Sequence, residues 1–343
     1  MTRQRNWRGW RDQLAGDEMK ENNIAGLSVT IVVNKQVAVS RAYGMADAEN
    51  HVPVSTATRF RSGSIAKPIT AAAAMALYQS GRLDLDAPVQ EYCPAFPRKH
   101  WTITTRELLG HLAGIRHYRD DQSDLYSAKH YTDVRGGFEL FAGDPLLFQP
   151  GTRTLYSTYG YSVVGCVIEG ASGEEFRGAL NELVLEPAKM RWTRPDNVLE
   201  IPTGRSRPYT VNKDHTLRNA TFVDTSNKIP EGGLISTSDD LSAFAIALES
   251  NTFLNSQTTA LMWTSQNTSA GQATGYGYGW EVNQQNGMQW VERTGRQPGT
   301  SDILVLLPSR DFAVAIMSNT DDIDVTPMAE TLARAYLAGT GGR

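Results

Sequence analysis

A serine and a lysine lie three residues apart at the start of an alanine-rich segment. Ser64 and Lys67 are followed by the run 71–74, four consecutive alanines, and such a run favours a helix. Side chains three residues apart share one face of a helix, so these two groups would be neighbours. A serine hydroxyl becomes an effective nucleophile when a base lies beside it. The spacing indicates acyl transfer through serine, and a helix cap with a solvated lysine remains the alternative at this point.

An acyl-serine site also needs a second proton-handling group and N–H donors for the tetrahedral oxyanion. Two later segments offer such groups. Tyr156 lies in the segment 155–161, which follows a Pro-Gly turn at 150–151. The segment 291–296, Val-Glu-Arg-Thr-Gly-Arg, is expected at the end of a strand. A buried core tyrosine with a satisfied hydroxyl is the competing interpretation of Tyr156.

The overall composition is that of an ordinary globular protein. The chain has 343 residues, 40% hydrophobic and 20% charged, with a formal net charge of −4. A nucleic-acid-binding protein should present a basic face, so this class is not expected. No apolar run approaches the roughly 20 residues that a membrane helix needs. No signal peptide is recognised in the chain as given, which leaves a cytoplasmic location, or a periplasmic or secreted one after signal removal.

The histidines and cysteines do not form a recognisable metal or disulfide pattern. His111 and His117 are the closest pair of the six histidines, and their spacing is not that of a zinc site. No metal site is therefore expected, and acyl transfer through serine implies no organic cofactor. Cys93 and Cys166 both lie in apolar surroundings and could pair, but two cysteines do not make a disulfide framework. We expect buried free thiols.

Strand patterns gather at the two ends of the chain. The β-rich runs 25–33 and 37–43 predict a hairpin, and the runs 276–282 and 288–292 flank Asn-Gly, a strong hairpin signal. A further hairpin is expected from 303–307 and 312–317 around Pro-Ser-Arg-Asp.

Helix patterns occupy the middle of the chain and both termini. Trp7, Trp10 and Leu14 share one face of an N-terminal helix. Further helices are expected from Ser64 to about 81, and from about 328 to 337. Three capping boxes predict helices at 107–113, from 175 to about 185, and through 248; they begin at Thr104, Ser172 and Thr237.

This order of elements predicts an α+β fold. An antiparallel sheet is built from the N- and C-terminal segments and flanked by helices, with a mostly helical region inserted. We expect a sheet region at 1–59 and 231–343, a helical region at 60–230, and one catalytic unit with its site at their junction.

The motifs together resemble the serine β-lactamase-related family, which comprises class C β-lactamases, DD-peptidases and family VIII carboxylesterases. Within it, the chain is most similar to LACTB-type proteins. The resemblance extends from about residue 24 onward and implies a β-lactamase/transpeptidase-like fold. It rests on the stretches 60–70, 81–86, 104–118, 149–165, 232–241, 276–280 and 293–308.

The resemblance implies specific roles. Ser64 would be the acylated nucleophile, Lys67 its proton partner and Tyr156 a second acid/base group, while the backbone N–H groups of Ser64 and Arg296 would form the oxyanion hole. Lowering a tyrosine pKa from about 10 to near 7 requires roughly 4 kcal/mol of phenolate stabilisation. Lys67 and Arg293 are the cations that could supply it.

Two positions depart from the family pattern. Thr158 replaces the asparagine of Tyr-x-Asn, which weakens a β-lactamase interpretation because a threonine hydroxyl is shorter. The LACTB type also carries threonine there. Arg293 replaces the lysine or histidine of Lys-Thr-Gly; it stays charged, but can hold a substrate carboxylate or pair with a neighbouring acid such as Glu292 or Asp302. Substrate-binding residues are expected to be Thr158, Arg293, Thr294, Gly295 and Tyr118, with the 117–131 stretch walling the cleft.

These observations predict a serine hydrolase that acts through an acyl-enzyme on Ser64. Carboxylesterase activity on short acyl esters is favoured, because esters need less leaving-group protonation than amides. Peptidase activity follows, and DD-peptidase or weak β-lactamase activity is a further alternative. The partner would be a small ester, amide or peptide, and a homo-oligomer is open. A non-catalytic, self-assembling scaffold with the same fold is the alternative from another class.

Overall fold

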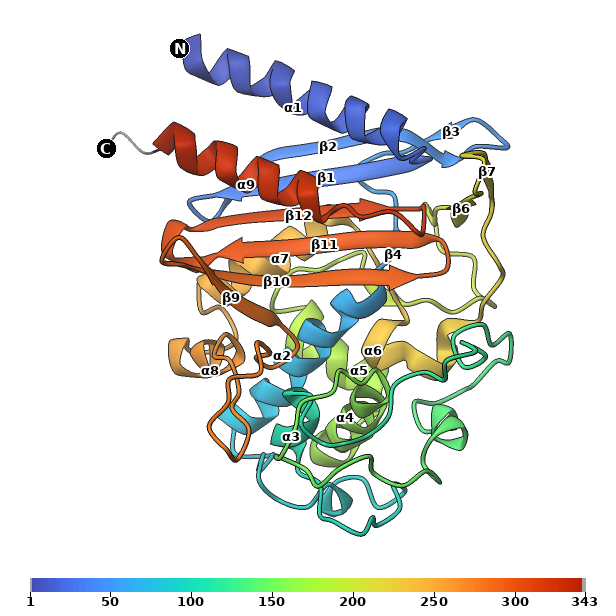
Figure 1. Ribbon diagram of the computed structural model, residues 1–343, viewed down its shortest axis with the longest axis vertical. Coiled ribbons are helices and arrows are strands. Elements are labelled where there is room, and N and C mark those ends of the chain that lie inside the picture. Colours follow the sequence, from blue (N-terminus) through green and yellow to red (C-terminus); the bar gives the residue numbers. More distant parts are fainter. Residues whose placement is uncertain (1, 341–343) are drawn as a thin grey trace.

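The protein is built around a seven-stranded antiparallel sheet with helices on both faces (Figure 1). The computed structural model describes residues 2–340, and the side chains of residues 12–338. The sheet order is β3-β2-β1-β12-β11-β10-β9, so the first and last parts of the chain meet at the β1–β12 pair. The predicted α+β class is confirmed. The strands are β1 Gly26–Val33, β2 Gln36–Asp47, β3 Val52–Pro53, β9 Glu281–Gln285, β10 Met288–Gln297, β11 Thr300–Leu307 and β12 Phe312–Ser318.

Alternate side chains of the central strands point to opposite faces of the sheet, so the interior consists of two hydrophobic cores. In β11, Ile303 and Val305 face a cluster shared with α1 (Thr2–Glu21) and α9 (Thr326–Thr340). Leu304 and Leu306 face the opposite cluster, which includes α7 (Ser238–Glu249) and the central helices. Successive side chains of a strand point to opposite faces, so a strand covered on both faces is apolar throughout. All three predicted hairpins form, but the first strand of the second one is Glu281–Gln285 and not 276–282.

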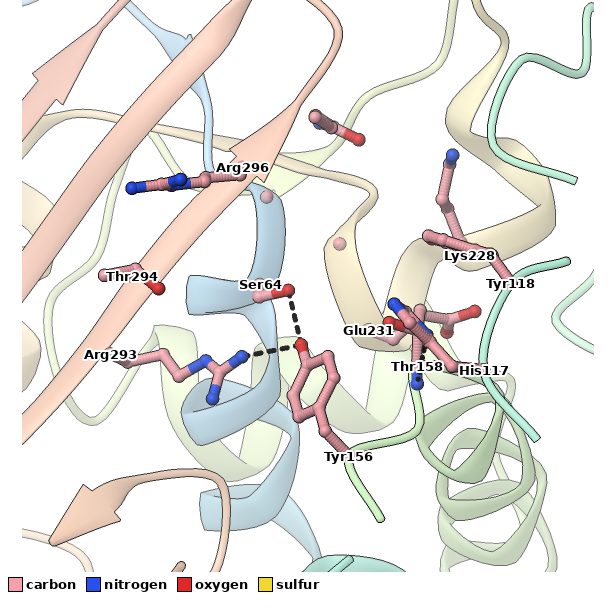
Figure 2. Close-up of a pocket in the computed structure, with 13 residues that line it drawn as sticks. Ser64, His117, Tyr118, Tyr156, Thr158, Lys228, Glu231, Arg293, Thr294 and Arg296 are labelled. Atoms are coloured by element: carbon pink, nitrogen blue, oxygen red, sulfur yellow. Dashed lines mark hydrogen bonds between the residues drawn. The ribbon is translucent and has the colours of Figure 1, made fainter. Parts of the chain in front are cut away.

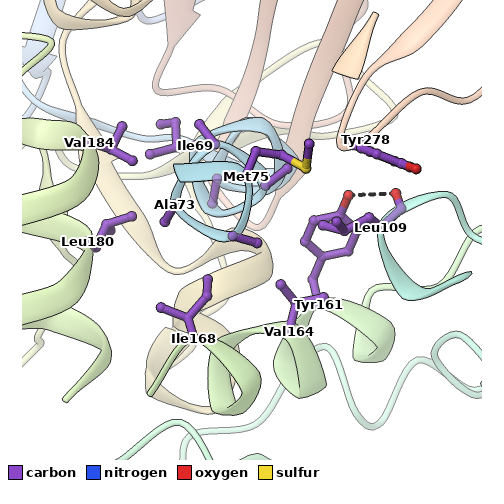
Figure 3. Close-up of a cluster of buried hydrophobic side chains, with 14 of the residues drawn as sticks. Ile69, Ala73, Met75, Leu109, Tyr161, Val164, Ile168, Leu180, Val184 and Tyr278 are labelled. Carbon is purple, nitrogen blue, oxygen red and sulfur yellow. Dashed lines mark hydrogen bonds between the residues drawn. The ribbon is translucent and has the colours of Figure 1, made fainter. Parts of the chain in front are cut away.

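Helix α2 (Ala66–Gln79) is the buried centre of the larger core (Figure 3). The alanines 71–74 are fully buried, and their small side chains let neighbouring helices approach closely. Helix α4 (Tyr159–Ser172) packs against α2. Tyr161 on α4 donates a hydrogen bond of 2.8 Å to the carbonyl of Leu109. The run of alanines therefore serves both helix formation and packing.

One of the three predicted capping boxes is confirmed in full, and a second only as an N-cap, because the Asp240 carboxylate accepts from Trp192 and Thr193 instead. Thr104 caps α3 (Thr105–Leu109), a helix that ends at Leu109 and is shorter than predicted. Thr237 caps α7 by accepting from the N–H of Asp240. The box at Ser172 is wrong, because this serine is the last residue of α4 and its hydroxyl accepts from the N–H of Glu174.

The remaining elements are short and connect the helices to the sheet. Two small sheets lie outside the main one. Their strands, together with the short helices and turns, are β4 Phe60–Arg61, β5 Arg194–Pro195, β6 Tyr209–Val211, β7 Leu217–Asn219, β8 Leu234–Ser236, α5 Phe176–Leu180, α6 Ile229–Gly232, α8 Ser256–Met262, a π-helical turn Asn181–Leu185, and 3-10 turns at Gly63–Ile65, Val89–Glu91, Gly136–Leu140, Thr225–Lys228 and Pro308–Arg310.

The two cysteines form a disulfide, so the expectation of free thiols is wrong. Cys93 follows the 3-10 turn at Val89–Glu91, and Cys166 lies on α4, with Cα atoms 5.4 Å apart. Both side chains belong to the larger core. Apolar surroundings were a correct inference for each residue, but their meeting depends on how α4 packs, which the spacing does not reveal.

The terminal helices pack on the same side of the sheet. Ala15 of α1 is buried in the smaller core, and Leu14 packs against it. The side chains of Trp7 and Trp10 lie outside the described part of the chain. Within residues 2–340, no helix is long and apolar enough to span a membrane. The division into regions 1–59 and 231–343 against 60–230 stays a prediction.

Candidate active site

Ser64 lies in a 3-10 turn, Gly63–Ile65, that leads directly into α2 (Figure 2). Its hydroxyl does not cap α2, whose N-cap residue is Ile65. Lys67, in the first turn of α2, is fully buried rather than solvated. Its Nζ donates to Ser64 Oγ at 3.0 Å. The alternative of a helix cap beside a solvated lysine is therefore wrong.

Lys67 is held in place by two other segments of the chain. Its Nζ donates to the backbone carbonyl of Glu231 at 2.8 Å and to Thr158 Oγ1 at 3.4 Å. The threonine thus reaches the lysine despite its short side chain. Burial lowers the pKa of Lys67, and the nearby Arg293 lowers it further, while Tyr156 opposes the shift. Near neutral pH, Lys67 is therefore more often the neutral amine, the form that can accept a proton, than an exposed lysine is.

Tyr156 completes the contacts of the serine hydroxyl. Its phenol oxygen lies 2.8 Å from Ser64 Oγ and accepts a 2.6 Å hydrogen bond from Arg293 Nη2. Burial alone would raise the pKa of Tyr156, but Arg293 and Lys67 favour the phenolate and bring the pKa to about 8. The phenol is therefore poised to exchange protons close to neutral pH.

Arg293 on β10 is buried and engaged on both sides. Its Nη1 pairs with Glu281 Oε1 at 3.0 Å, while its Nη2 serves Tyr156. The acids expected as partners from the sequence are occupied elsewhere: Glu292 accepts from Asn283, and Asp302 accepts from Thr300 and from a backbone N–H. The alternative of an arginine paired with a neighbouring acid is confirmed, but the acid is Glu281 on the neighbouring strand β9 and not Glu292 or Asp302.

Two neutral histidine rings flank Tyr156. The ring centroids of His111 and His117 lie 4.6 and 5.2 Å from that of Tyr156. His111 Nδ1 accepts from the N–H of Ser157, and His117 Nδ1 accepts from the N–H of Thr158, both at 3.3 Å. Burial and the cations of the site lower the pKa of His117 to about 4. These rings hold the 156–158 segment; sequence reasoning assigned a wall role to His117 and none to His111.

Strand β10 touches the serine turn closely. Gly63 has φ +47°, and a Cβ atom there would lie 2.6 Å from the backbone nitrogen of Arg296. A Cβ atom on Gly295 would lie 2.2 Å from the carbonyl oxygen of Ser62. Glycine is required at both positions for this approach. The backbone N–H of Arg296 is thereby placed beside the turn that carries Ser64.

These residues open onto a pocket of about 210 Å³. Seven of the predicted site residues line the pocket, as does His117, which was predicted in its wall. Lys67 lies behind Ser64, and Gly295 packs against Ser62. Lys228, Glu231 and Gln297 also line the pocket and were not predicted; the first two stand just before the recognised stretch 232–241. The complete lining is Gly63, Ser64, His117, Tyr118, Tyr156, Thr158, Lys228, Glu231, Gly232, Arg293, Thr294, Arg296 and Gln297.

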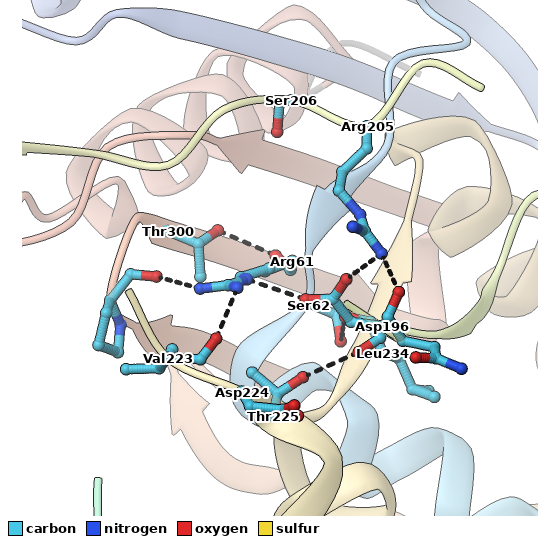
Figure 4. A network of polar contacts seen from close by, with 12 residues as sticks. Arg61, Ser62, Asp196, Arg205, Ser206, Val223, Asp224, Thr225, Leu234 and Thr300 are labelled. Atoms are coloured by element: carbon cyan, nitrogen blue, oxygen red, sulfur yellow. Dashed lines mark hydrogen bonds and ion pairs between the residues drawn. The ribbon is translucent and has the colours of Figure 1, made fainter. Parts of the chain in front are cut away.

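A polar network anchors the segment that precedes Ser64 (Figure 4). Arg61 pairs with the buried Asp196 at 3.0 Å and donates to the carbonyls of Val223 and Pro298, both at 3.1 Å. Arg205 contacts the other oxygen of Asp196 at 2.8 Å. Four distant segments therefore meet three residues before the serine, which restricts movement of the turn.

Comparison with known proteins finds relatives of this chain. The human mitochondrial serine beta-lactamase-like protein LACTB is 28% identical, over 82% of this chain and 69% of its own. Esterase EstB of Burkholderia gladioli is 31% identical, over 52% of this chain and 49% of its own.

Solved structures share the fold. The octameric penicillin-binding protein homologue from Pyrococcus abyssi superposes with a TM-score of 0.83 at 22% identity, covering 96% of this chain and 77% of that one. EstCE1, described as a hydrolase with promiscuous acyltransferase activity, gives a TM-score of 0.81 at 21% identity, covering 98% and 99%. The sequence model of the Beta-lactamase family matches residues 11–338, nearly the whole chain. The protein therefore belongs to the Beta-lactamase family, as the sequence motifs indicated.

Proposed function

We propose that this protein is a serine hydrolase that cleaves short acyl esters through an acyl-enzyme on Ser64. The observation that carries the proposal is the pair of contacts at Ser64 Oγ, 3.0 Å from Lys67 Nζ and 2.8 Å from the Tyr156 hydroxyl. A nucleophile with two proton-exchanging neighbours is what acyl transfer requires.

In the first step, Ser64 Oγ attacks the ester carbonyl as its proton passes to the Tyr156–Lys67 pair. The negative charge on the carbonyl oxygen is stabilised by the backbone N–H groups of Ser64 and Arg296. The leaving alcohol takes its proton from Tyr156, and the acyl group stays on Ser64. Water then attacks the acyl-enzyme by the same route in reverse, releasing the acid and restoring the serine.

Arg293 supports this chemistry through Tyr156. Because its Nη1 is paired with Glu281 and its Nη2 with the phenol, a bidentate grip on a substrate would break one of these contacts. We assign it the role of stabilising the phenolate. Thr158, Thr294 and Tyr118 line the pocket and are assigned to substrate contact.

Esters are the favoured substrate for two reasons. An ester leaving group needs less protonation than an amine, and a pocket of about 210 Å³ suits a short acyl chain. Peptide hydrolysis is the second candidate, favoured because the phenol beside Ser64 has a pKa of about 8 and can protonate an amine leaving group.

Intact-mass analysis after treatment with a fluorophosphonate tests the proposal. One adduct is expected on the wild type and none on Ser64→Ala. A wild-type protein that the fluorophosphonate does not label and that does not hydrolyse a nitrophenyl ester would refute the proposal. The non-catalytic scaffold would then be the remaining alternative. A panel of nitrophenyl ester, D-Ala-D-Ala peptide and chromogenic cephalosporin then ranks the substrates, and the ester is expected to turn over fastest.

A further inference from the structure

A lysine that the acyl-transfer chemistry does not use lies in the pocket wall opposite β10 (Figure 2). Lys228 ends the 3-10 turn Thr225–Lys228, and its side chain is only 2% exposed. Its Nζ donates to the carbonyl of Leu125 at 3.1 Å and lies 5.6 Å from the centroid of the Tyr118 ring. Lys228 and Tyr118 both line the pocket.

The cations of the pocket differ in how they are compensated. Arg293 pairs with Glu281 at 3.0 Å, and Arg296 pairs with Asp324 at 3.1 Å. Within residues 12–338, Lys228 has no ion pair, and the one hydrogen bond of its Nζ is to Leu125. An ammonium group carries three donors, so two of them have no partner in the described structure.

The acid nearest in the wall does not neutralise this lysine directly. Glu231 Oε1 accepts a 2.5 Å hydrogen bond from Ser162 on α4, and its Oε2 has no partner among the described side chains. The backbone carbonyl of Glu231 is used by Lys67. Glu231 thus lies close enough to affect Lys228 electrostatically without forming an ion pair with it.

A purely structural tether is a weak explanation for Lys228. One hydrogen bond to the Leu125 carbonyl could come from a neutral side chain, whereas burying an ammonium is costly unless it is paired. An anion bound in the pocket would supply the missing partner. Such an anion must be part of the substrate, since Lys228 lines the same pocket as Ser64.

Geometry also indicates which part of the substrate carries the anion. Tyr156, which we assign to protonate the leaving alcohol, contacts Arg293 on the β10 side of Ser64. The leaving group is therefore expected on that side, and the acyl chain faces the opposite wall, where Lys228 and Tyr118 lie.

We propose that Lys228 forms a carboxylate subsite for the acyl chain, so that the preferred substrates are monoesters of short dicarboxylic acids. This inference rests on the proposed serine hydrolase function. The bound carboxylate would accept from the two spare donors of Lys228, and charge-assisted hydrogen bonds of this kind are strong.

The preference should depend on pH. Burial lowers the pKa of Lys228 to about 7, with Arg61 and Lys67 acting in the same direction and Glu231 and Asp124 against it. Below that value the amine is charged and binds the carboxylate. Above it the charge is lost, and Glu231, whose pKa burial raises to about 7, becomes an anion that repels the substrate. The preference is therefore expected to be largest below pH 7.

The test compares the hydrolysis of ethyl hydrogen glutarate with that of ethyl pentanoate. The release of ethanol measures the rate for both esters. We expect the wild type to favour the glutarate ester at least tenfold in kcat/KM at pH 6.5. Lys228→Met should lower this ratio about tenfold or more, whereas Lys228→Arg should keep most of it. Lys99→Met is the matched control, because Lys99 also donates to backbone carbonyls, of Ala142 and Asp144, without lining the pocket.

Three outcomes overturn the inference. The first is a wild type with no preference for the glutarate ester, and the second is a folded Lys228→Met variant that keeps the wild-type ratio of kcat/KM values. The third outcome is that Arg296→Gln loses this ratio while Lys228→Met keeps it. If Lys228→Met does not fold, the test rests on the wild-type preference and on whether Lys228→Arg keeps most of it. Calorimetric binding of glutarate against pentanoate gives a readout without turnover. A protein that fluorophosphonate fails to label refutes the proposed function, whereas a labelled protein without preference for glutarate refutes only the carboxylate subsite.

Discussion

The guanidinium of Arg293 donates a 2.6 Å hydrogen bond to the phenol oxygen of Tyr156, which itself lies 2.8 Å from Ser64 Oγ. An arginine cannot exchange protons at neutral pH, and this contact shows where its fixed charge acts. It favours the phenolate of Tyr156. The departure from a lysine or histidine at this position is therefore compatible with a working acid/base pair.

Removing the charge of Arg293 should change the pH dependence of ester hydrolysis. With Tyr156 at a pKa of about 8, kcat/KM should rise with pH and level off above that value, because the deprotonated phenol is the base. In Arg293→Gln the pKa of Tyr156 rises, so the midpoint moves upward, and activity at pH 7 falls roughly tenfold for every pH unit by which the midpoint moves. Initial rates from pH 6 to 10 give the profile.

Arg293→Lys is the control for this change, since it keeps a positive charge and should move the midpoint less. Tyr156→Phe should abolish the rise of kcat/KM with pH entirely. An Arg293→Gln profile that coincides with the wild type would show that Tyr156 is not the titrating group.

An alanine at Gly63 should reduce turnover far more than stability. A Cβ atom there would lie 2.6 Å from the Arg296 nitrogen and push apart the two proposed oxyanion donors. Losing one such donor costs about 10²–10³ in kcat. Gly81→Ala is the matched control, because Gly81 also has positive φ (+74°) but its Cβ would meet nothing within 4 Å. Both variants should lose about 1–2 kcal/mol of stability from the backbone strain, Gly63→Ala should lose more because of its contact with Arg296, and only Gly63→Ala should lose kcat. Equal loss of kcat in both would contradict the oxyanion assignment.

The disulfide between Cys93 and Cys166 should contribute substantially to stability. It closes a loop with a sequence separation of 73 residues, for which chain entropy predicts about 4 kcal/mol. Denaturant unfolding of the wild type with and without reductant measures this, and the Cys93→Ala/Cys166→Ala double variant should match the reduced protein. Reductant should have no effect on the double variant. If oxidised and reduced wild type unfold at the same denaturant concentration, the linkage does not form in solution.

Arg61 should matter for both stability and activity. Arg61→Leu removes the 3.0 Å pair with Asp196, and breaking a buried ion pair costs about 3 kcal/mol. Arg205→Leu removes the other contact of the same carboxylate and serves as the control. We expect both variants to be destabilised, but kcat of the folded protein to fall only in Arg61→Leu, because Arg61 lies three residues before Ser64. An undiminished kcat in Arg61→Leu would rule out a positioning role.

Local patterns predicted the elements that depend on near neighbours in the chain. The Asn286–Gly287 hairpin and the caps at Thr104 and Thr237 are confirmed, because turn geometry and N-cap hydrogen bonds involve residues within a few positions. The box at Ser172 was wrong because packing continued α4 through that residue. A capping pattern indicates where a helix can begin, and tertiary contacts decide whether the preceding one has ended.

The sequence by itself determined the α+β class, the family and the set of polar residues that meet at Ser64, since motif order and spacing are linear properties. Only the tertiary structure decided which side chains contact one another. Glu281 rather than Glu292 faces Arg293, Cys93 meets Cys166, and Lys228 enters the pocket wall. Each of these depends on which strands and helices lie side by side, and that arrangement arises from burying two apolar faces of one sheet at once.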